Sequence, residues 1–265
     1  MAFRLTQAIA ARKTLPLSAT PCDNQGVPRI LAALATPLLL ACTGGAGGPP
    51  TPTVDLEALA RELAPGVPLT LGDLPAGWDE SMADLVGQVE LSPECDIFDL
   101  DVAFPGAAAT AQSPDYEGML NEQLITYAAV FHSADDARAT VQATRGTVER
   151  CRDEFTSEGR RLAEAELEAL GVDLGLFADI TVEIFERENA PTLGDVSAAY
   201  VLQVTVSLPG DDQRFTIDVR AFAEGRVAGA IICAKFGADD PAAALDLAQR
   251  LLGKAAVAEA QLPAP

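Results

Sequence analysis

The sequence predicts an α+β domain: a twisted antiparallel sheet of about six strands, with helices packed mainly on one face. Segments in which apolar and polar residues alternate, as in half-buried strands, recur along the chain. The last three of these segments follow one another through short turns, which leave no room for the crossover helices that parallel strands need. Helical patterns stand before and after this run of strands, which is typical of the α+β class.

The first predicted elements lie between residues 54 and 78. Leucines recur at helical spacing over 54–64 and predict a helix, which Pro65 ends. A turn-rich segment follows the helix. Its Trp78, the single tryptophan of the chain, is expected to fill the core at one end of the sheet.

Two strands are predicted in the next part of the chain. Residues 97–104 place apolar side chains on one face and Asp99 and Asp101 on the other, as expected of a half-buried strand. Residues 123–131 are apolar on nearly both faces. This second segment is therefore expected at the centre of the sheet.

The most clearly defined helix is predicted over 133–155. Ser133 is the candidate N-cap, aspartates follow it in the first turn, and Arg150 and Arg152 stand near the other end, as the helix dipole favours. Apolar residues recur at alternating steps of four and three, so Cys151 is expected to point into the core. This buried stripe comprises Ala137, Val141, Thr144, Val148, Cys151 and Phe155.

The second half of the chain is predicted to hold the remaining strands and a closing helix. Strands are predicted at 179–186, 198–208, 215–221 and 227–236, and the last three form a meander. Asp240 is the candidate N-cap of the closing helix, with Pro241 at its first position. Residues 160–175 fit neither a helical nor a strand period, and no element is predicted there.

A lipoprotein signal is predicted over 29–42. About a dozen apolar or small residues follow Arg29, whereas a helix needs about 20 residues to span a hydrocarbon core of about 30 Å. Leu-Leu-Ala stands directly before Cys42, in the order of a bacterial lipobox. Cys42 is therefore expected to carry a diacylglyceryl group, whose two acyl chains anchor more firmly than one. The alternative is an ordinary secretory signal in which Cys42 is incidental.

The chain is divided into a signal, a tether, one domain and a tail. Residues 1–41 are the signal peptide; residues 1–26 are long for an n-region, and initiation at Val27 would give a compact one. Residues 42–53 are mostly Gly, Pro and Thr and form a flexible tether. Residues 54–258 form a single domain, and residues 259–265 form a tail.

The acidic composition narrows the range of partners. The chain has a formal net charge of −21. Removing residues 1–41, with four basic residues and one acidic residue, leaves 14 basic and 38 acidic side chains and a charge of −24. Such a surface repels nucleic acid and anionic lipid headgroups. No nucleic-acid partner is expected, and the lipid on Cys42 would be the contact with the membrane.

Cysteine and histidine usage limits the chemistry further. Cys95, Cys151 and Cys233 remain once the signal is removed and Cys42 is lipidated, so an oxidising compartment allows one disulfide and one free thiol. The sequence contains no Cys-x-x-Cys motif, and its single histidine is His132. A zinc site of the usual kind is therefore excluded for want of ligands.

No catalytic or cofactor motif stands out, and a protein without enzymatic activity or cofactor is expected. A Ser/His/Asp or Cys/His nucleophile would need His132, which stands between a strand and a helix cap, where an imidazole is usually structural or exposed. Asp99 and Asp101, roughly 7 Å apart on a strand, would suit a loose calcium site or a glycosidase pair, but a solvated strand face has the same pattern. No G-x-G-x-x-G, P-loop or EF-hand sequence is present.

Several short motifs together carry a family resemblance. They are Leu-Pro-Ala-Gly-Trp at 74–78 with a cysteine soon after, Arg-Cys-Arg at 150–152, Pro-Thr-Leu-Gly-Asp-Val-Ser-Ala-Ala-Tyr at 191–200, and a closing hairpin followed by a helix. With them, residues 71–255 resemble actinobacterial lipoproteins related to the extracellular sensor domain of PknH-type Ser/Thr kinases. The resemblance implies a twisted antiparallel sheet with a cleft for an extracellular ligand, and a disulfide between Cys95 and Cys151. A Cys151–Cys233 pair stays open as the alternative.

These observations predict a non-catalytic lipoprotein anchored at the extracytoplasmic face of the cell membrane. Its domain would bind an extracellular ligand or an envelope protein, as a sensor domain does. The alternative is a structural or assembly lipoprotein that docks on an envelope protein complex and has no small-molecule pocket.

Overall fold

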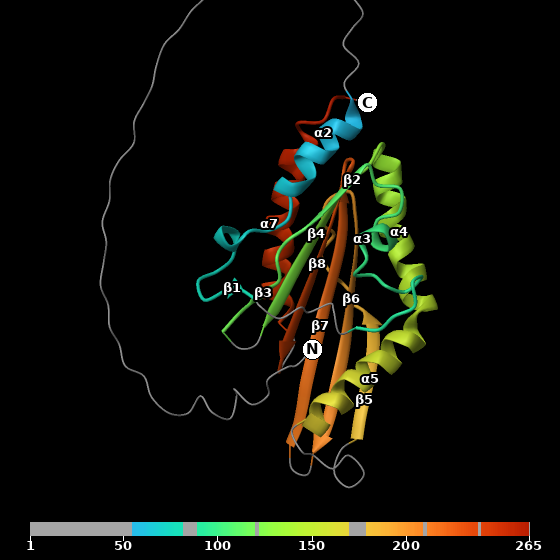
Figure 1. The fold of residues 1–265 in the computed structure, drawn as a ribbon, viewed down its shortest axis with the longest axis vertical. Helices are drawn as coiled ribbons and strands as arrows, with labels where there is room; N and C mark the ends of the chain where they lie inside the picture. The colour runs from blue at the N-terminus through green and yellow to red at the C-terminus, as the bar shows by residue number, and fades with distance from the viewer. Residues whose placement is uncertain are drawn as a thin grey trace, which may run out of the picture. The chain divides into compact units, whose positions relative to one another are not determined.

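The computed structural model describes residues 55–81, 89–119, 122–169, 179–208, 211–237 and 240–264 (Figure 1). The predicted signal, Cys42 and the whole tether lie outside these residues. The described part forms an antiparallel sheet of eight strands together with five α-helices. The predicted number of strands was too low: three short strands form where none was predicted, and one predicted strand does not form.

All pairings between the strands of the sheet are antiparallel. The strands are β1 (Asp79–Glu80), β2 (Ala109–Gln112), β3 (Tyr116–Glu117), β4 (Gln123–Val130), β5 (Asp179–Glu186), β6 (Val196–Leu208), β7 (Asp211–Glu224) and β8 (Val227–Phe236). Their order is β1-β3-β4-β8-β7-β6-β5, and β2 also pairs with β4. The predicted meander of β6, β7 and β8 is confirmed.

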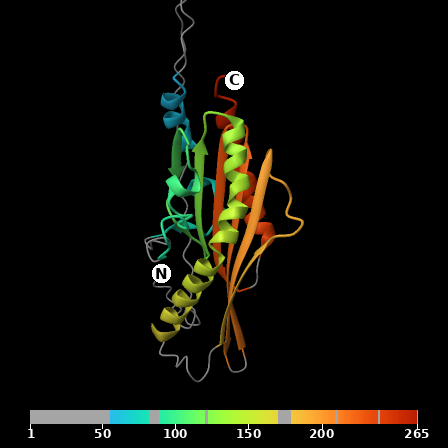
Figure 2. The ribbon, with the colours of Figure 1, turned by 90° about the vertical axis from the view of Figure 1, so that its right-hand side faces the viewer.

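Helices cover both faces of the sheet, whereas the sequence predicted them mainly on one. The helices are α2 (Leu56–Leu63), α3 (Leu100–Ala103), α4 (Ala134–Arg150), α5 (Arg152–Ala169) and α7 (Pro241–Glu259). In Figures 1 and 2, α2 and α7 lie on one side of the strands, and α4 and α5 lie on the other. The result is three layers: helices, sheet and helices.

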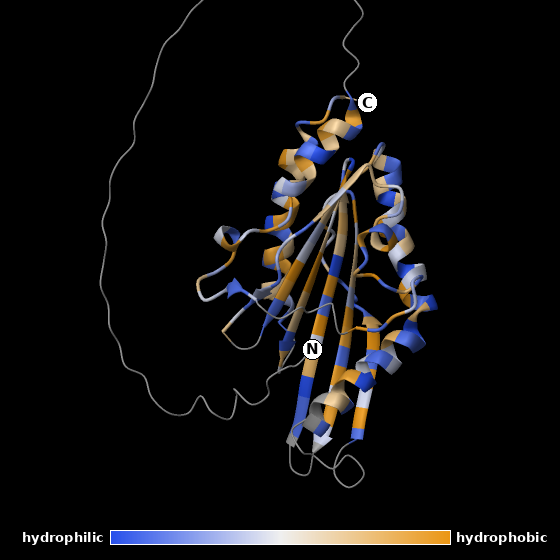
Figure 3. Cartoon of the chain, in the orientation of Figure 1, coloured by the Kyte–Doolittle hydropathy of each residue, from blue (hydrophilic) through white to orange (hydrophobic). Residues whose placement is uncertain are grey.

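The alternation of strand residues explains why both faces need a cover. Ile231 of β8 belongs to the core beneath α2 and α7, and its neighbour Ile232 belongs to the core beneath α4. Every residue of β4 is buried, which confirms its predicted central position. A strand that is apolar on both faces can bury them only between two layers of helices. Figure 3 shows the hydrophilic residues that interrupt the apolar ones along β6 and β7.

The predicted strand at 97–104 is wrong. Asp99 instead caps the short helix α3, and its carboxylate accepts a hydrogen bond of 2.8 Å from the backbone N–H of Asp101. Phe104 at the end of this helix is buried in the core beneath α4. The apolar residues of this segment therefore reach the core from turns and from the short helix α3. Asp99 and Asp101 do not form a carboxylate pair on a strand.

The predicted helix at 133–155 forms as two helices. Ser133 caps α4 as expected, because its Oγ accepts from the backbone N–H of Asp136 at 3.1 Å. The helical geometry breaks at Cys151, after which α5 runs to Ala169 and takes up much of the segment left unassigned. The predicted stripe nevertheless stays continuous across the break, and Cys151 is buried as expected.

The closing helix α7 is confirmed, including its cap. Asp240 accepts a hydrogen bond from the backbone N–H of Ala243 at 3.2 Å, and Pro241 occupies the first turn. The segment predicted as a tail packs onto the domain, since Leu262 is buried and the Pro263 carbonyl accepts a 2.7 Å hydrogen bond from Arg226. Within the described part of the chain, no helix combines the length and the apolar character that crossing a membrane requires.

The edge strand β5 is covered by two arginines of α5. The backbone N–H of Arg187 donates to the Ala199 carbonyl of β6. Backbone groups along a strand point alternately to its two sides, so the N–H and C=O groups of every second residue from Glu186 back to Ile180 point away from β6, toward the free edge of the sheet. Arg160 donates to the Ile180 carbonyl at 2.7 Å, and Arg152 donates to the Ile184 carbonyl. The two arginines are about as far apart as the two carbonyls, because eight helical residues rise about 12 Å and four strand residues about 13 Å.

Removing both arginines is expected to expose a sheet edge that can pair with another molecule. The double variant Arg152→Ala/Arg160→Ala should lose about 1–2 kcal/mol of stability with its two hydrogen bonds. It should also self-associate in sedimentation velocity. The double variant Arg145→Ala/Arg150→Ala on α4 makes the same change in charge and should stay monomeric. Equal behaviour of the two double variants would contradict the edge-capping role.

Asp73 ties the segment after α2 to the closing helix. Its carboxylate accepts hydrogen bonds of 2.8 Å from Lys254 of α7 and from the backbone N–H of Thr70. Burial raises the pKa of Asp73, but the hydrogen bonds from Lys254 and Thr70 outweigh burial and lower this pKa from 3.8 to about 2. The ionised form is thus the one that the fold favours.

A lowered carboxyl pKa predicts a loss of stability in acid. The contribution of Asp73 should be fully present above pH 4 and should be lost as the pH falls toward 2. We expect it to be about 1 kcal/mol, since Asp73 is 32% exposed and solvent screens the pair. Asp73→Asn should flatten this part of the pH profile in urea unfolding, whereas Asp246→Asn on the surface of α7 should not. A steep acid loss that survives in Asp73→Asn would assign the effect to another group.

Candidate functional site

The cysteines lie on opposite faces of the sheet. Cys95 and Cys151 form a disulfide, the pair that the family resemblance implied, and they pack with Phe155. Cys233 is free and packs beneath α7. The alternative Cys151–Cys233 pair is therefore wrong, because the sheet itself separates the two sulfurs. Cys42 lies outside the described residues, and its lipidation stays a prediction.

A pocket opens beside Cys233, where β7 and β8 pass under the first turn of α7. Its cavity volume is about 40 Å³, and about 400 Å³ is empty when the open solvent at its mouth is included. Its polar and aromatic lining consists of Trp78, Glu122, Thr216, Asp218, Cys233, Lys235 and Asp240. Its apolar lining consists of Ala234, Ala243, Ala244 and Leu247. Segments far apart in the sequence thus meet at this point.

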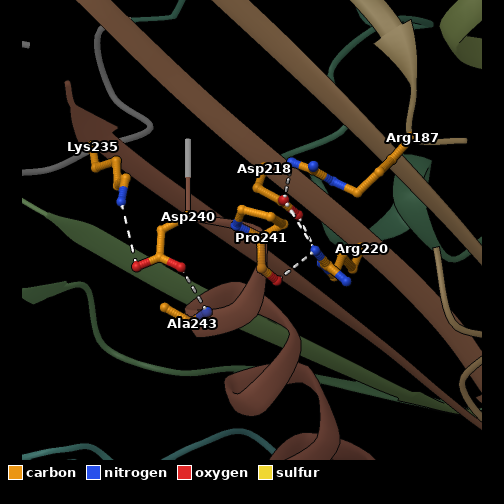
Figure 4. A network of polar contacts seen from close by, with 7 residues as sticks. All are labelled: Arg187, Asp218, Arg220, Lys235, Asp240, Pro241 and Ala243. Atoms are coloured by element: carbon orange, nitrogen blue, oxygen red, sulfur yellow. Dashed lines mark hydrogen bonds and ion pairs between the residues drawn. The ribbon is translucent and has the colours of Figure 1, made fainter. Parts of the chain in front are cut away.

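A buried ionic network supports one wall of the pocket (Figure 4). Asp218 of β7 accepts from Arg187 at 2.7 Å and from Arg220 at 2.9 and 3.2 Å. Asp218 is only 4% exposed and Arg220 only 2%. Because burying a lone charge is very unfavourable, each of these side chains depends on its partners.

The same network fixes the start of α7 against the sheet. Arg220 also donates to the Pro241 carbonyl at 3.0 Å. On the other side of the pocket, Lys235 lies 3.8 Å from the cap residue Asp240. Polar contacts thus reach the first turn of the helix from both sides (Figure 4).

Two uncharged groups in the wall have distinct properties. Thr216 is 2% exposed, and its hydroxyl has no hydrogen-bond partner among the described residues. Burial is the main cause that raises the pKa of the Cys233 thiol, and the negative charge of Asp218 raises it further. The thiol therefore stays protonated and is a poor nucleophile, since the thiolate is the reactive form.

Trp78 and Glu122 meet at the outer side of the pocket, over Gly118. If residue 118 had a Cβ atom, this atom would lie 3.0 Å from Glu122 Oε2 and 3.3 Å from Trp78 Cε2. Glycine thus leaves room for these two side chains to approach each other. Trp78 is half-buried and packs on the core beneath α7, which agrees with its predicted place at one end of the sheet.

The candidate site residues chosen from the sequence do not come together. His132 is exposed at the start of α4, and Asp99 is an N-cap. In the part of the chain that the structure describes, no three His, Cys, Asp or Glu side chains are grouped so that they could hold a metal ion. The pocket residues were missed, because the alternation of polar and apolar residues in β7 does not show which face of the strand a helix covers.

Comparison with known proteins gives a weak structural likeness. No protein-family model matches the sequence, and no curated protein matches it. The structure is similar to the crystal structure of the extracellular domain of PknH from Mycobacterium tuberculosis, with a TM-score of 0.35 and 12% identity. The match covers 58% of this chain and 69% of that one.

Proposed function

We propose that this chain is a lipid-anchored extracytoplasmic protein whose single domain binds a ligand and does not catalyse a reaction. The observation that carries the proposal is the sequence Leu-Leu-Ala before Cys42, preceded by a short apolar run and followed by a tether. An apolar run of this length is processed as a signal, and a lipidated cysteine then holds the exported chain.

The disulfide supports the proposed location. Cys95 and Cys151 are bonded in the core against Phe155. Structural disulfides form and persist in oxidising compartments and are rare in the cytosol of most organisms. An exported domain is therefore the natural setting for this core.

Two groups of the pocket wall, the Asp218 carboxylate and the Cys233 thiol, are poorly suited to catalysis. The Asp218 carboxylate is occupied by two guanidinium groups, and the Cys233 thiol is held in its neutral form. A general base or a nucleophile needs a free lone pair at a suitable pKa. The walls instead combine apolar and charged groups in fixed positions, as binding sites do.

Removing the lipidation site tests the anchor. Wild-type protein expressed in an actinobacterial host is expected to fractionate with membranes, and the Cys42→Ser variant is expected to be retained as precursor or released in soluble form. A Cys233→Ser variant, which leaves the signal intact, should fractionate like the wild type. Membrane association that survives in Cys42→Ser would contradict lipid anchoring.

Native mass spectrometry separates ligand binding from the alternative function. The domain is recovered without its lipid from its own envelope extract. A retained small molecule supports the ligand binder. A protein that co-purifies at fixed stoichiometry supports instead a docking lipoprotein, for which the charge of −24 on the processed chain favours a basic partner.

A further inference from the structure

We propose that the pocket beside Cys233 accepts a small primary alkylammonium ion, held between Trp78 and Glu122. This inference rests on the proposed binding function and names the chemical class of its ligand. It follows from the charges that line the pocket, from the neighbouring aromatic ring and from an unpartnered hydroxyl in the wall.

One carboxylate that lines the pocket has no ion-pair partner in the part of the chain that the structure describes. Four charged residues line it: Glu122, Asp218, Lys235 and Asp240. Asp218 pairs with Arg187 and Arg220, which are not among the lining residues, and Lys235 lies 3.8 Å from Asp240. Glu122 forms no ion pair within the described residues. Glu122 is therefore the lining charge that can still pair with a cationic ligand.

An aromatic ring stands beside this carboxylate. Glu122 Oε2 and Trp78 Cε2 both approach the same point above Gly118. The face of an indole attracts a cation through its quadrupole, more strongly than the ring of tyrosine or phenylalanine does. A carboxylate and an indole side by side thus favour an ammonium group over a neutral or anionic one.

The rest of the wall favours a primary amine with a short alkyl chain. The Thr216 hydroxyl, which has no hydrogen-bond partner among the described residues, can accept a hydrogen bond from an N–H donor, which a quaternary ammonium lacks. Ala234, Ala244 and Leu247 provide an apolar surface for a few methylene groups. The strongly acidic chain also raises the local concentration of cations.

Trp78 reports directly on this site, because it is the single tryptophan of the chain. The purified domain, residues 54–265, is titrated with n-butylammonium at constant ionic strength while tryptophan emission is recorded. A saturable change is expected. The neutral analogue 1-butanol and the anion butyrate should bind at least tenfold more weakly, a difference of about 1.4 kcal/mol.

Two matched variants test the role of the carboxylate. Glu122→Gln keeps the shape of the side chain and removes its charge, and it should weaken n-butylammonium binding about tenfold, to the level of the alcohol. Glu117→Gln makes the same change at an exposed position of β3 outside the pocket and should bind like the wild type. Circular dichroism verifies that both variants are folded.

Three results would overturn the proposal. They are equal binding of n-butylammonium and 1-butanol, preferred binding of butyrate or inorganic phosphate, and no saturable response to n-butylammonium. None of them contradicts the proposed function, because a different molecule retained in native mass spectrometry would still identify a ligand-binding domain. Conversely, n-butylammonium binding by a chain that is never exported would contradict the proposed location and leave the ligand class intact.

Discussion

Replacing Asp218 with alanine is expected to destabilise the domain by about 3–5 kcal/mol. The substitution leaves the Arg187 and Arg220 guanidinium groups facing each other without their shared carboxylate, and Arg220 is only 2% exposed. It also loosens the first turn of α7, which Arg220 holds through the Pro241 carbonyl. Urea unfolding followed by circular dichroism measures the change.

A matched substitution and an apolar replacement control this result. Asp135→Ala removes an exposed carboxylate that pairs with Arg138, and it should change stability by less than about 1 kcal/mol. The triple variant Arg187→Met/Asp218→Leu/Arg220→Met should be more stable than Asp218→Ala alone, since it leaves no buried charge. If Asp218→Ala is as stable as Asp135→Ala, the network does not support the pocket.

Removing the disulfide with Cys95→Ala/Cys151→Ala is expected to destabilise the domain by about 4 kcal/mol. The bond joins residues 56 positions apart, and breaking it returns a long loop to the unfolded chain. Cys233→Ala leaves this bond intact and should cost about 1 kcal/mol, mainly through lost packing. Denaturant midpoints with and without reductant compare the variants.

The reductant makes the disulfide prediction specific. Reduction should lower the stability of the wild type and of Cys233→Ala by a similar amount. It should leave the Cys95→Ala/Cys151→Ala variant unchanged. If reduction destabilises that double variant as well, the effect does not come from this bond.

Much of the fold could be predicted where the signal is local. The caps Ser133 and Asp240, the meander of β6 to β8 and the fully buried, mainly apolar β4 depend on residues that are close in sequence. Period and cap chemistry determine such elements directly. The number of helical layers cannot be predicted from local sequence, since it depends on which face of the sheet each helix packs against.

The segment around Asp99 shows how a local pattern can mislead. Its alternation of apolar and acidic residues equally suits a strand and an Asp cap followed by one helical turn. The capped helical turn forms instead of the strand, because the Asp99 carboxylate accepts a hydrogen bond from the backbone N–H of Asp101 while Phe104 still reaches the core. Capping chemistry can thus outweigh a short period-two pattern.

The candidate site was hidden by a similar ambiguity in β7. Its polar residues Thr216, Asp218 and Arg220 are buried beneath or beside α7, whereas the apolar Ile217 and Val219 on the opposite face are only partly buried. Alternation in the sequence shows that a strand has two chemically different faces. It does not show which face is covered when helices lie on both sides.

The intact mass of the protein extracted from its own membranes tests the central claim most directly. Without reduction, the sample is denatured and treated with a thiol-alkylating reagent. We predict a chain that begins at Cys42, carries a diacylglyceryl group and takes up one alkyl group, at Cys233. A chain with an unmodified Cys42 thiol, or one in which Cys95 and Cys151 are also alkylated, would contradict an exported, lipid-anchored domain.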